Sequence, residues 1–100
     1  MARSTPFVWQ IQVRREVLDD EMARLRGLPY TLWKDMLGQS ISKSVTGRDE
    51  KTYRVTVTPE PLPGTSGDIR ISLSLARDTL LRRRLLRQEF VITPANEFRV

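Results

Sequence analysis

Hydrophobic and polar residues alternate with a period of two through much of the second half of the chain. The alternation is clearest from Ile69 to Ala76, where Ile and Leu take turns with Arg, Ser and Ala. This period puts alternate side chains on opposite faces of a β-strand, so one face should lie in the core and the other in water. The pattern predicts four strands, at residues 40–46, 51–58, 68–76 and 88–93.

The residues between these strands are typical of turns. Gly47, in the short connection of residues 47–50, indicates a β-hairpin. Residues 59–68 hold three prolines, which cannot donate to a sheet ladder, so we expect an exposed loop there. We also predict an irregular or bulged stretch at residues 82–84 and turns at residues 77–79 and 94–97.

Residues 16–26 have the charge order of a helix. Acidic residues 19–21 come before Arg24 and Arg26, and Gly27 follows. Acids near the start of a helix and bases near its end complement the macrodipole, and glycine readily takes the left-handed conformation that ends a helix. We therefore expect these acids near the first turn of a helix, where consecutive side chains fan out and do not converge on a metal.

A second helix is expected directly after the first. Pro29 suits the first turn of a helix, where the N–H that proline lacks has no partner, and apolar residues follow it before Gly38. We expect Trp9, Trp33 and Tyr53 to be core residues, because a domain this small needs large side chains to fill its interior.

Residues 6–14 fit two structures. As a strand, the segment would alternate its apolar side chains from Phe7 to Val13 with mostly polar neighbours. As a helix, it would begin at Pro6 and place Phe7 and Ile11 on the same face as later apolar residues. A strand here could pair with a sheet edge of its own domain or of a second chain, and so form a dimer.

These elements together predict an α+β fold in which two N-terminal helices pack on one face of a four-stranded antiparallel meander. Residues 16–100 would form this single domain, and residues 1–15 an N-terminal segment that extends it as a strand or a helix. The 100-residue length suits one domain, and 39% hydrophobic with 29% charged residues is the composition of a globular protein. No apolar run approaches the length of a membrane span, so we expect a cytoplasmic protein without a membrane partner.

The chain contains neither histidine nor cysteine. It therefore lacks the usual general base near neutral pH, the usual nucleophile pair and the usual zinc and iron ligands. We expect no catalytic residues, no metal site and no cofactor, and hence a protein that is not an enzyme.

Positive charge is concentrated in the last third of the chain. Residues 69–100 carry seven arginines against three acidic residues, and the net charge of the whole chain is +5. No aromatic residue interleaves these arginines, as a surface that stacks single-stranded bases requires, and charge runs on small basic domains usually face water. Arginine nevertheless suits phosphate and carboxylate, so the candidate contacts with an anion or a nucleic acid are Arg77, Arg82, Arg83, Arg84 and Arg87.

These observations favour a small non-catalytic interaction module that binds a protein partner or a second copy of itself. The alternative is a basic module that binds nucleic acid or another anionic ligand through the run from Arg82 to Arg87. Replacing these arginines should abolish salt-sensitive binding to polyanions, but it should leave a protein partner at the helices or the sheet edge unaffected.

Several stretches of the chain together resemble a group of short bacterial proteins of unknown function. They are residues 25–30 (LRGLPY), 49–53 (DEKTY), 67–74 (GDIRISLS) and 90–92 (FVI), with Pro94 and Phe98. Those proteins are built as helices followed by an antiparallel meander, so the resemblance implies this fold and no particular activity. They tend to carry an Asp-Asp-Gly turn after the third strand, where this chain has Arg-Asp-Thr at residues 77–79.

Overall fold

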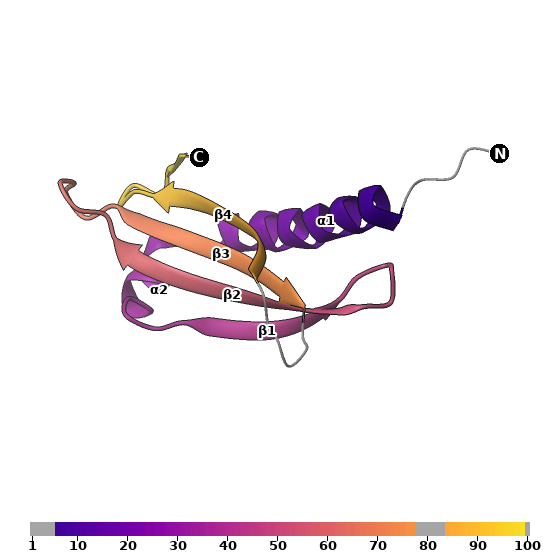
Figure 1. Cartoon of the computed structure of the whole chain (residues 1–100). Coiled ribbons are helices and arrows are strands. Elements are labelled where there is room, and N and C mark those ends of the chain that lie inside the picture. Colours follow the sequence, from indigo (N-terminus) through magenta and orange to yellow (C-terminus); the bar gives the residue numbers. More distant parts are fainter. Residues whose placement is uncertain (1–5, 78–83, 100) are drawn as a thin grey trace.

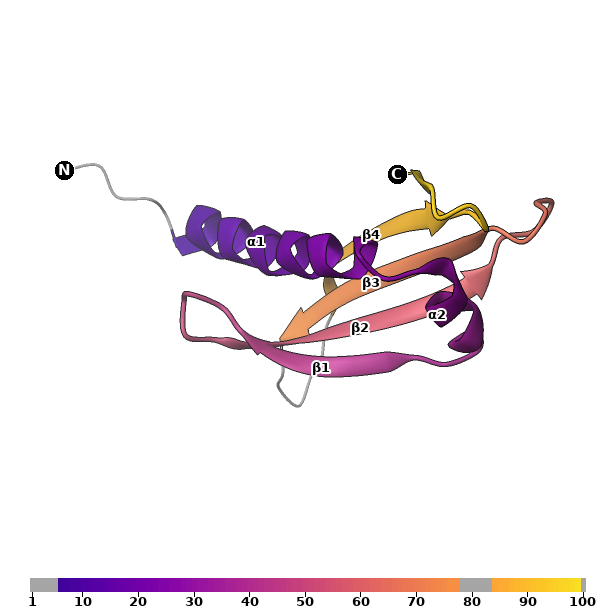
Figure 2. The same ribbon diagram turned by 180° about the vertical axis from the view of Figure 1, so that it is seen from behind.

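In the part of the chain that the structure describes, two helices pack on one face of a five-stranded antiparallel sheet (Figures 1 and 2). The computed structural model describes residues 6–77 and 84–99, and of residues 6–10, 84 and 85 only the backbone. The predicted α+β fold, with N-terminal helices and an antiparallel meander, is confirmed. The elements are α1 (Pro6–Arg26), α2 (Tyr30–Asp35), β1 (Ile41–Thr46), β2 (Thr52–Pro61), β3 (Ile69–Arg77), β4 (Arg84–Ile92) and β5 (Phe98–Arg99).

Helix α1 runs without a break from Pro6 to Arg26 and packs against β3 and β4 (Figure 2). Residues 6–14 are therefore helical, and the strand alternative for them is wrong. No proline or glycine interrupts the sequence between this segment and residues 16–26, so the helix predicted there begins earlier. The buried apolar side chains recur at the spacing of one helical face and are Val13, Val17, Leu18, Met22 and Leu25.

The acidic residues 19–21 lie in the C-terminal half of α1 and not near its first turn. Our interpretation of them as first-turn partners of the helix dipole is therefore wrong. Asp19 Oδ1 accepts a hydrogen bond from Gln88 Nε2 of β4 at 3.1 Å, and Glu21 pairs with Lys43 of β1. Arg24 and Arg26 do lie in the last turn of α1, as expected.

The core lies between the helices and the sheet. Trp33 of α2 and Tyr53 of β2 are fully buried, as predicted, whereas the side chain of Trp9 lies outside the described residues. Trp33 meets Phe90 of β4 edge to face, with 6.4 Å between the ring centroids. The alternating pattern of the strands is confirmed, since their buried side chains face the helices and include Val55, Val57, Ile69, Ile71, Leu73, Leu75 and Ile92.

Helix α2 covers only one end of the sheet (Figure 2). It follows Pro29, which has an extended backbone (φ −74°, ψ 158°) and immediately precedes the first helical residue. Two hydrogen bonds from Tyr30 hold it in place. The Tyr30 N–H donates to Asn96 Oδ1 at 2.8 Å, and the hydroxyl donates to the Gly67 carbonyl at 2.5 Å. These bonds join the start of α2 to the β2–β3 loop and to the β4–β5 turn.

Strand β2 continues through two prolines, so the loop predicted at residues 59–68 begins later than expected. Pro59 pairs with Ile71 and Pro61 with Ile69 in the register with β3. Hydrogen bonds alternate along the β1–β2 hairpin, so the backbone N–H and C=O groups of the odd-numbered residues of β2 point toward β1. Strand β1 begins only opposite Val57. The N–H that each proline lacks would point past the end of β1, where no ladder bond is lost.

The C-terminal part of the sheet is longer than predicted. Strand β4 begins at Arg84, before the predicted residues 88–93. The short β5, which the four-stranded prediction omits, pairs with Val91 and Ile92 at the end of β4. Its two residues are too few to produce a period. The turn predicted at residues 94–97 is confirmed.

A bulge interrupts the register of β3 and β4. Leu75 pairs with Leu86, but Ala76 pairs with Arg84, so β4 holds one more residue than β3 at this point. The extra residue is Leu85, one position after the irregular stretch predicted at residues 82–84, and Arg84 itself is paired. Two residues of the predicted irregular stretch, Arg82 and Arg83, lie outside the described part of the chain. So do Asp78 and Thr79 of the turn predicted at residues 77–79.

Candidate functional site

Strand β1 is an exposed edge of the sheet. Within residues 6–77 and 84–99, β2 is the only strand that pairs with it, and all its residues except the half-buried Val45 are exposed. An edge strand presents a row of backbone N–H and C=O groups with which another extended chain can pair. The predicted meander places this strand first and therefore at an edge, and the order of the strands agrees (Figure 1).

The β1–β2 hairpin determines which backbone groups of β1 face outward. The Gly47 N–H donates to the Lys51 carbonyl at 3.0 Å, and Glu50, with φ 64°, donates its N–H to the Gly47 carbonyl at 2.9 Å. Bonded pairs recur at every second position of an antiparallel ladder, so β2 bonds the odd-numbered residues of β1. The backbone groups that point away from β2 belong to residues 42, 44 and 46.

A groove lies between β1 and α1 on the helix side of the sheet. It consists of two hollows of about 170 and about 230 Å³ that share Glu21 in their lining. Helix α1 packs on β3 and β4 (Figure 2). Ile41 and Val45 of β1 therefore keep part of their surface exposed. The smaller hollow lies near α2. Its lining is mostly apolar (Leu25, Leu28, Trp33, Met36, Ile41, Val55 and Val57) and also includes Glu21, Arg24 and Lys43.

Two ion pairs cross this groove from α1. Glu21 Oε1 lies 2.6 Å from Lys43 Nζ of β1. Glu16 accepts hydrogen bonds from Arg48 of the hairpin through both carboxylate oxygens, each at 2.7 Å. Glu21 also accepts a hydrogen bond from Arg24 on its own helix at 2.9 Å. Lys43 is thus held at the centre of β1 by a carboxylate of the helix.

Burial and hydrogen bonding act in opposite directions on Glu21. Desolvation raises the pKa of its carboxyl, but hydrogen bonds from Arg24 and Lys43 together with their charges outweigh this effect, and the pKa lies below its ordinary value. The carboxylate therefore stays ionised at neutral pH and keeps both cations as partners.

The ion pairs of Glu21 should make stability depend on pH in acid. Because the pKa is lower in the folded protein than in the unfolded chain, the stabilisation is complete above the ordinary value of 4.5 and is lost as the pH falls through the folded value. We expect Glu21→Gln to lower the free energy of unfolding by about 1 kcal/mol at neutral pH. The difference from wild type should shrink below the ordinary pKa.

Urea denaturation of both proteins between about pH 3 and pH 7 measures this difference. Hydrogen bonds also lower the pKa of Asp49 despite desolvation. Asp49 is present in both proteins, so its pH-dependent contribution to the free energy of unfolding cancels in the difference. A difference that stays constant over the whole range would show that the charge of Glu21 contributes nothing.

Among the described residues, the candidate arginines do not converge on one surface. Arg77 faces the helices, because it pairs with the buried Tyr53, whereas Arg87 pairs with Ser74 and faces the other side of the sheet. The remaining candidates have no described side chains and are Arg82, Arg83 and Arg84.

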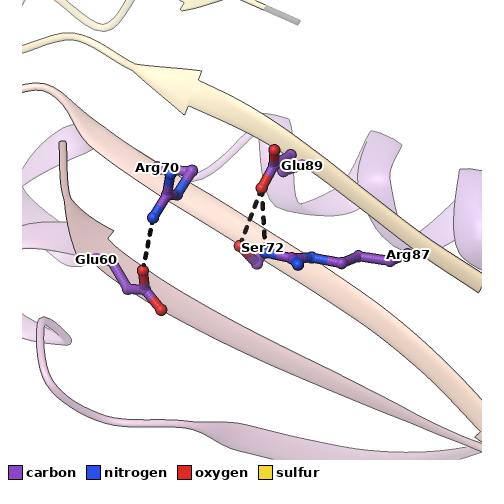
Figure 3. A network of polar contacts seen from close by, with 5 residues as sticks. All are labelled: Glu60, Arg70, Ser72, Arg87 and Glu89. Carbon is purple, nitrogen blue, oxygen red and sulfur yellow. Dashed lines mark hydrogen bonds and ion pairs between the residues drawn. The ribbon is translucent and has the colours of Figure 1, made fainter. Parts of the chain in front are cut away.

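The face of the sheet away from the helices is polar, and its charges pair with one another (Figure 3). Arg87 lies 3.3 Å from Glu89 and 3.4 Å from Ser72 Oγ, and Arg70 pairs with Glu60 at 2.9 Å. A hollow of about 230 Å³ lies among these side chains. Arg87, the candidate described on this face, therefore already has a carboxylate and a hydroxyl as partners.

Sequence reasoning did not single out the residues of the β1 edge. Their one local signal is Lys43, a charged residue in the middle of a short alternating strand. Lysine is common on edge strands, where it opposes unwanted pairing. The lysine indicates a binding edge only together with the position of β1 in the sheet and the contact of Lys43 with Glu21.

Among residues 6–77 and 84–99, no group of three or more His, Cys, Asp or Glu side chains gathers that could hold a metal ion. None of the described helices has the length and apolar character needed to cross a membrane. Comparison of the chain with models of protein families, with curated proteins and with solved structures finds no match.

Proposed function

We propose that this protein is a small non-catalytic interaction module that binds an extended segment of another protein along the edge of β1. The observation that carries the proposal is the row of outward backbone groups on β1, next to the groove between β1 and α1. Main-chain hydrogen bonds to such an edge supply affinity, and pockets beside it select alternate side chains. The lack of histidine and cysteine also favours binding over catalysis.

Ser42→Pro should greatly weaken this binding and leave the fold intact. Proline removes the N–H of residue 42, which points away from β2, so no bond of the β1–β2 ladder is lost. An acceptor of the bound segment would then be unpaired, which costs roughly 1–3 kcal/mol, a loss in affinity of about 5- to 150-fold. Ser42→Ala is the matched control, because it removes the 2.9 Å contact of Ser42 Oγ with Thr56 Oγ1 but keeps the N–H.

The measurement is selection of a displayed library of random nine-residue peptides on the full chain, followed by fluorescence anisotropy of the enriched peptides. We expect them to bind wild type and Ser42→Ala within about twofold, and Ser42→Pro about 5- to 150-fold more weakly. Circular dichroism and thermal melting show whether each variant is folded. Peptides that bind Ser42→Pro as tightly as wild type would refute the edge as the binding site.

The alternative function, binding of nucleic acid or another anion through the arginines, predicts a different outcome. Labelled DNA or RNA would bind with an affinity that falls steeply with salt, and Ser42→Pro would not change it. The pairing of Arg87 with Glu89 and the opposite orientations of Arg77 and Arg87 favour the protein-binding proposal.

A further inference from the structure

We infer that the segment bound by β1 carries an acidic residue flanked, two positions away on each side, by apolar residues. This inference rests on the proposed function and names the chemistry of the partner. Its basis is the order of side chains on the helix side of β1, where Lys43 stands between Ile41 and Val45. Each of these three side chains would meet one side chain of an added strand.

The geometry of the edge brings these side chains close to their counterparts. The backbone groups of Ile41, Lys43 and Val45 bond to β2, so in an antiparallel addition they form the non-hydrogen-bonded pairs with the new strand. The Cα atoms of such pairs lie about 4.5 Å apart, closer than in bonded pairs. Side-chain chemistry is therefore selected directly at these positions. Lys43 selects an acidic residue, and the 44% exposed Ile41 selects an apolar one.

The apolar residue opposite Ile41 has room to bury its side chain. The hollow beside Ile41 measures about 170 Å³, and Val55, Val57 and Leu25 contribute to its apolar lining. A cavity of about 150 Å³ holds a benzene-sized group. A leucine- or phenylalanine-sized side chain that reaches past Ile41 would therefore fit this hollow and leave water.

Lys43 can bind a partner carboxylate without leaving Glu21 unpaired. The side chain of Lys43 is 43% exposed, whereas that of Glu21 is only 9% exposed. An unpaired carboxylate in such a place is costly, but Arg24 holds Glu21 at 2.9 Å independently of Lys43. The lysine ammonium also has three donors and can contact both carboxylates at once. The net charge of +5 adds a long-range attraction for an acidic segment.

The same order of side chains disfavours a second copy of this chain as the partner. If two β1 strands paired antiparallel about a two-fold axis, Lys43 would face its own counterpart or, after a shift of register, Ile41 or Val45 of the other copy. Like charges directly opposite destabilise a strand pair, and opposite an apolar residue the ammonium gains no acceptor beyond Glu21. The partner is therefore a different protein.

The test is a change of specificity with the charge at residue 43. The same peptide library is selected on wild type, on Lys43→Glu and on Lys34→Glu, which makes the same charge change at an exposed residue of α2 that lines neither hollow. Wild type and Lys34→Glu should enrich an acidic residue between apolar ones. Lys43→Glu should enrich lysine or arginine at that position and bind the wild-type peptides about tenfold more weakly.

A second variant covers the case in which Lys43→Glu does not fold because it places a carboxylate beside Glu21. Lys43→Gln adds no charge there, and it should lose the preference for an acidic residue while still binding extended peptides. Melting curves of all variants show which of them are folded.

Each outcome bears on either the inference or the proposed function. In one outcome, wild type and both variants at residue 43 enrich the same peptides, and Ser42→Pro no longer binds them. The edge then binds extended segments, but Lys43 does not select their sequence. This outcome overturns the inference. If nothing is enriched, or if Ser42→Pro binds the peptides as well as wild type, the proposed function fails too. A dimer in light scattering that Ser42→Pro dissociates would overturn the assignment to a different protein.

Discussion

Trp33→Ala should lower the free energy of unfolding by about 3–5 kcal/mol. Trp33 is fully buried and meets Phe90 at 6.4 Å between ring centroids, and Phe90 in turn meets Phe98 at 5.7 Å. Replacing the indole by a methyl group leaves a cavity beneath α2 that the surrounding structure fills only in part. Domains are stable by only about 5–15 kcal/mol, so the melting temperature should fall by roughly 12 °C or more.

Two further variants show whether packing causes this loss. Among the described residues, Trp33 Nε1 is buried without a hydrogen-bond partner. Trp33→Phe removes this unsatisfied donor and keeps a ring, so it should cost less than Trp33→Ala. Leu32, its neighbour on α2, is 39% exposed, and Leu32→Ala should cost about 0.5 kcal/mol. Urea denaturation followed by far-UV circular dichroism measures all three. Equal losses for Trp33→Ala and Leu32→Ala would contradict the role of Trp33 as a core anchor.

Gly47→Ala should cost about 1–3 kcal/mol. A Cβ atom at residue 47 would lie 2.7 Å from Asp49 Oδ1, 2.9 Å from Val13 Cγ1 and 3.1 Å from Tyr53 Cε2. The backbone of Gly47 is not in the left-handed region, so the cost comes from overpacking and not from strain. The hairpin end of β1 would have to move away from α1, and the far end of the groove would change with it.

Gly27→Ala provides the matched control for this substitution. The nearest atom to its added Cβ is the Arg24 carbonyl oxygen at 3.4 Å, and the backbone is again not left-handed. It should therefore stabilise the protein by about 0.4–1 kcal/mol through the lower entropy of the unfolded chain. Thermal melts compare the two variants. Combining Gly47→Ala with Val13→Ala should cost less than the sum of both, because the shorter side chain makes room. If the losses in free energy of unfolding of the two single variants simply add, the clash does not involve Val13.

The strands of the meander were predictable because their pattern is local. Strand β3 was predicted at residues 68–76 and is found at Ile69–Arg77, and every second side chain from Ile69 to Leu75 is apolar and faces the helices. A period of two in hydrophobicity has the same meaning wherever the strand lies in the sheet. The turn at Gly47 was likewise predictable from its short, glycine-containing connection between two alternating runs.

Segments that satisfy two patterns could not be assigned in the same way. Residues 6–14 fit both a strand and a helix, and the burial of Val13 against the hairpin belongs to the folded protein and not to the local sequence. The same holds for Pro59 and Pro61. Their place in β2 depends on where β1 begins, and nothing near them in the sequence indicates this.

The amino-acid sequence was thus enough to predict an α+β fold with helices on an antiparallel meander, because hydrophobic periodicity is a property of short segments. The candidate site needed the folded protein. The predicted meander already makes its first strand an edge, but that Lys43 meets Glu21 and that α1 leaves a groove beside this strand depend on contacts between residues far apart in the sequence. The arginine run stood out in the sequence, but the opposite faces of Arg77 and Arg87 follow from strand register, which is set by pairing between segments.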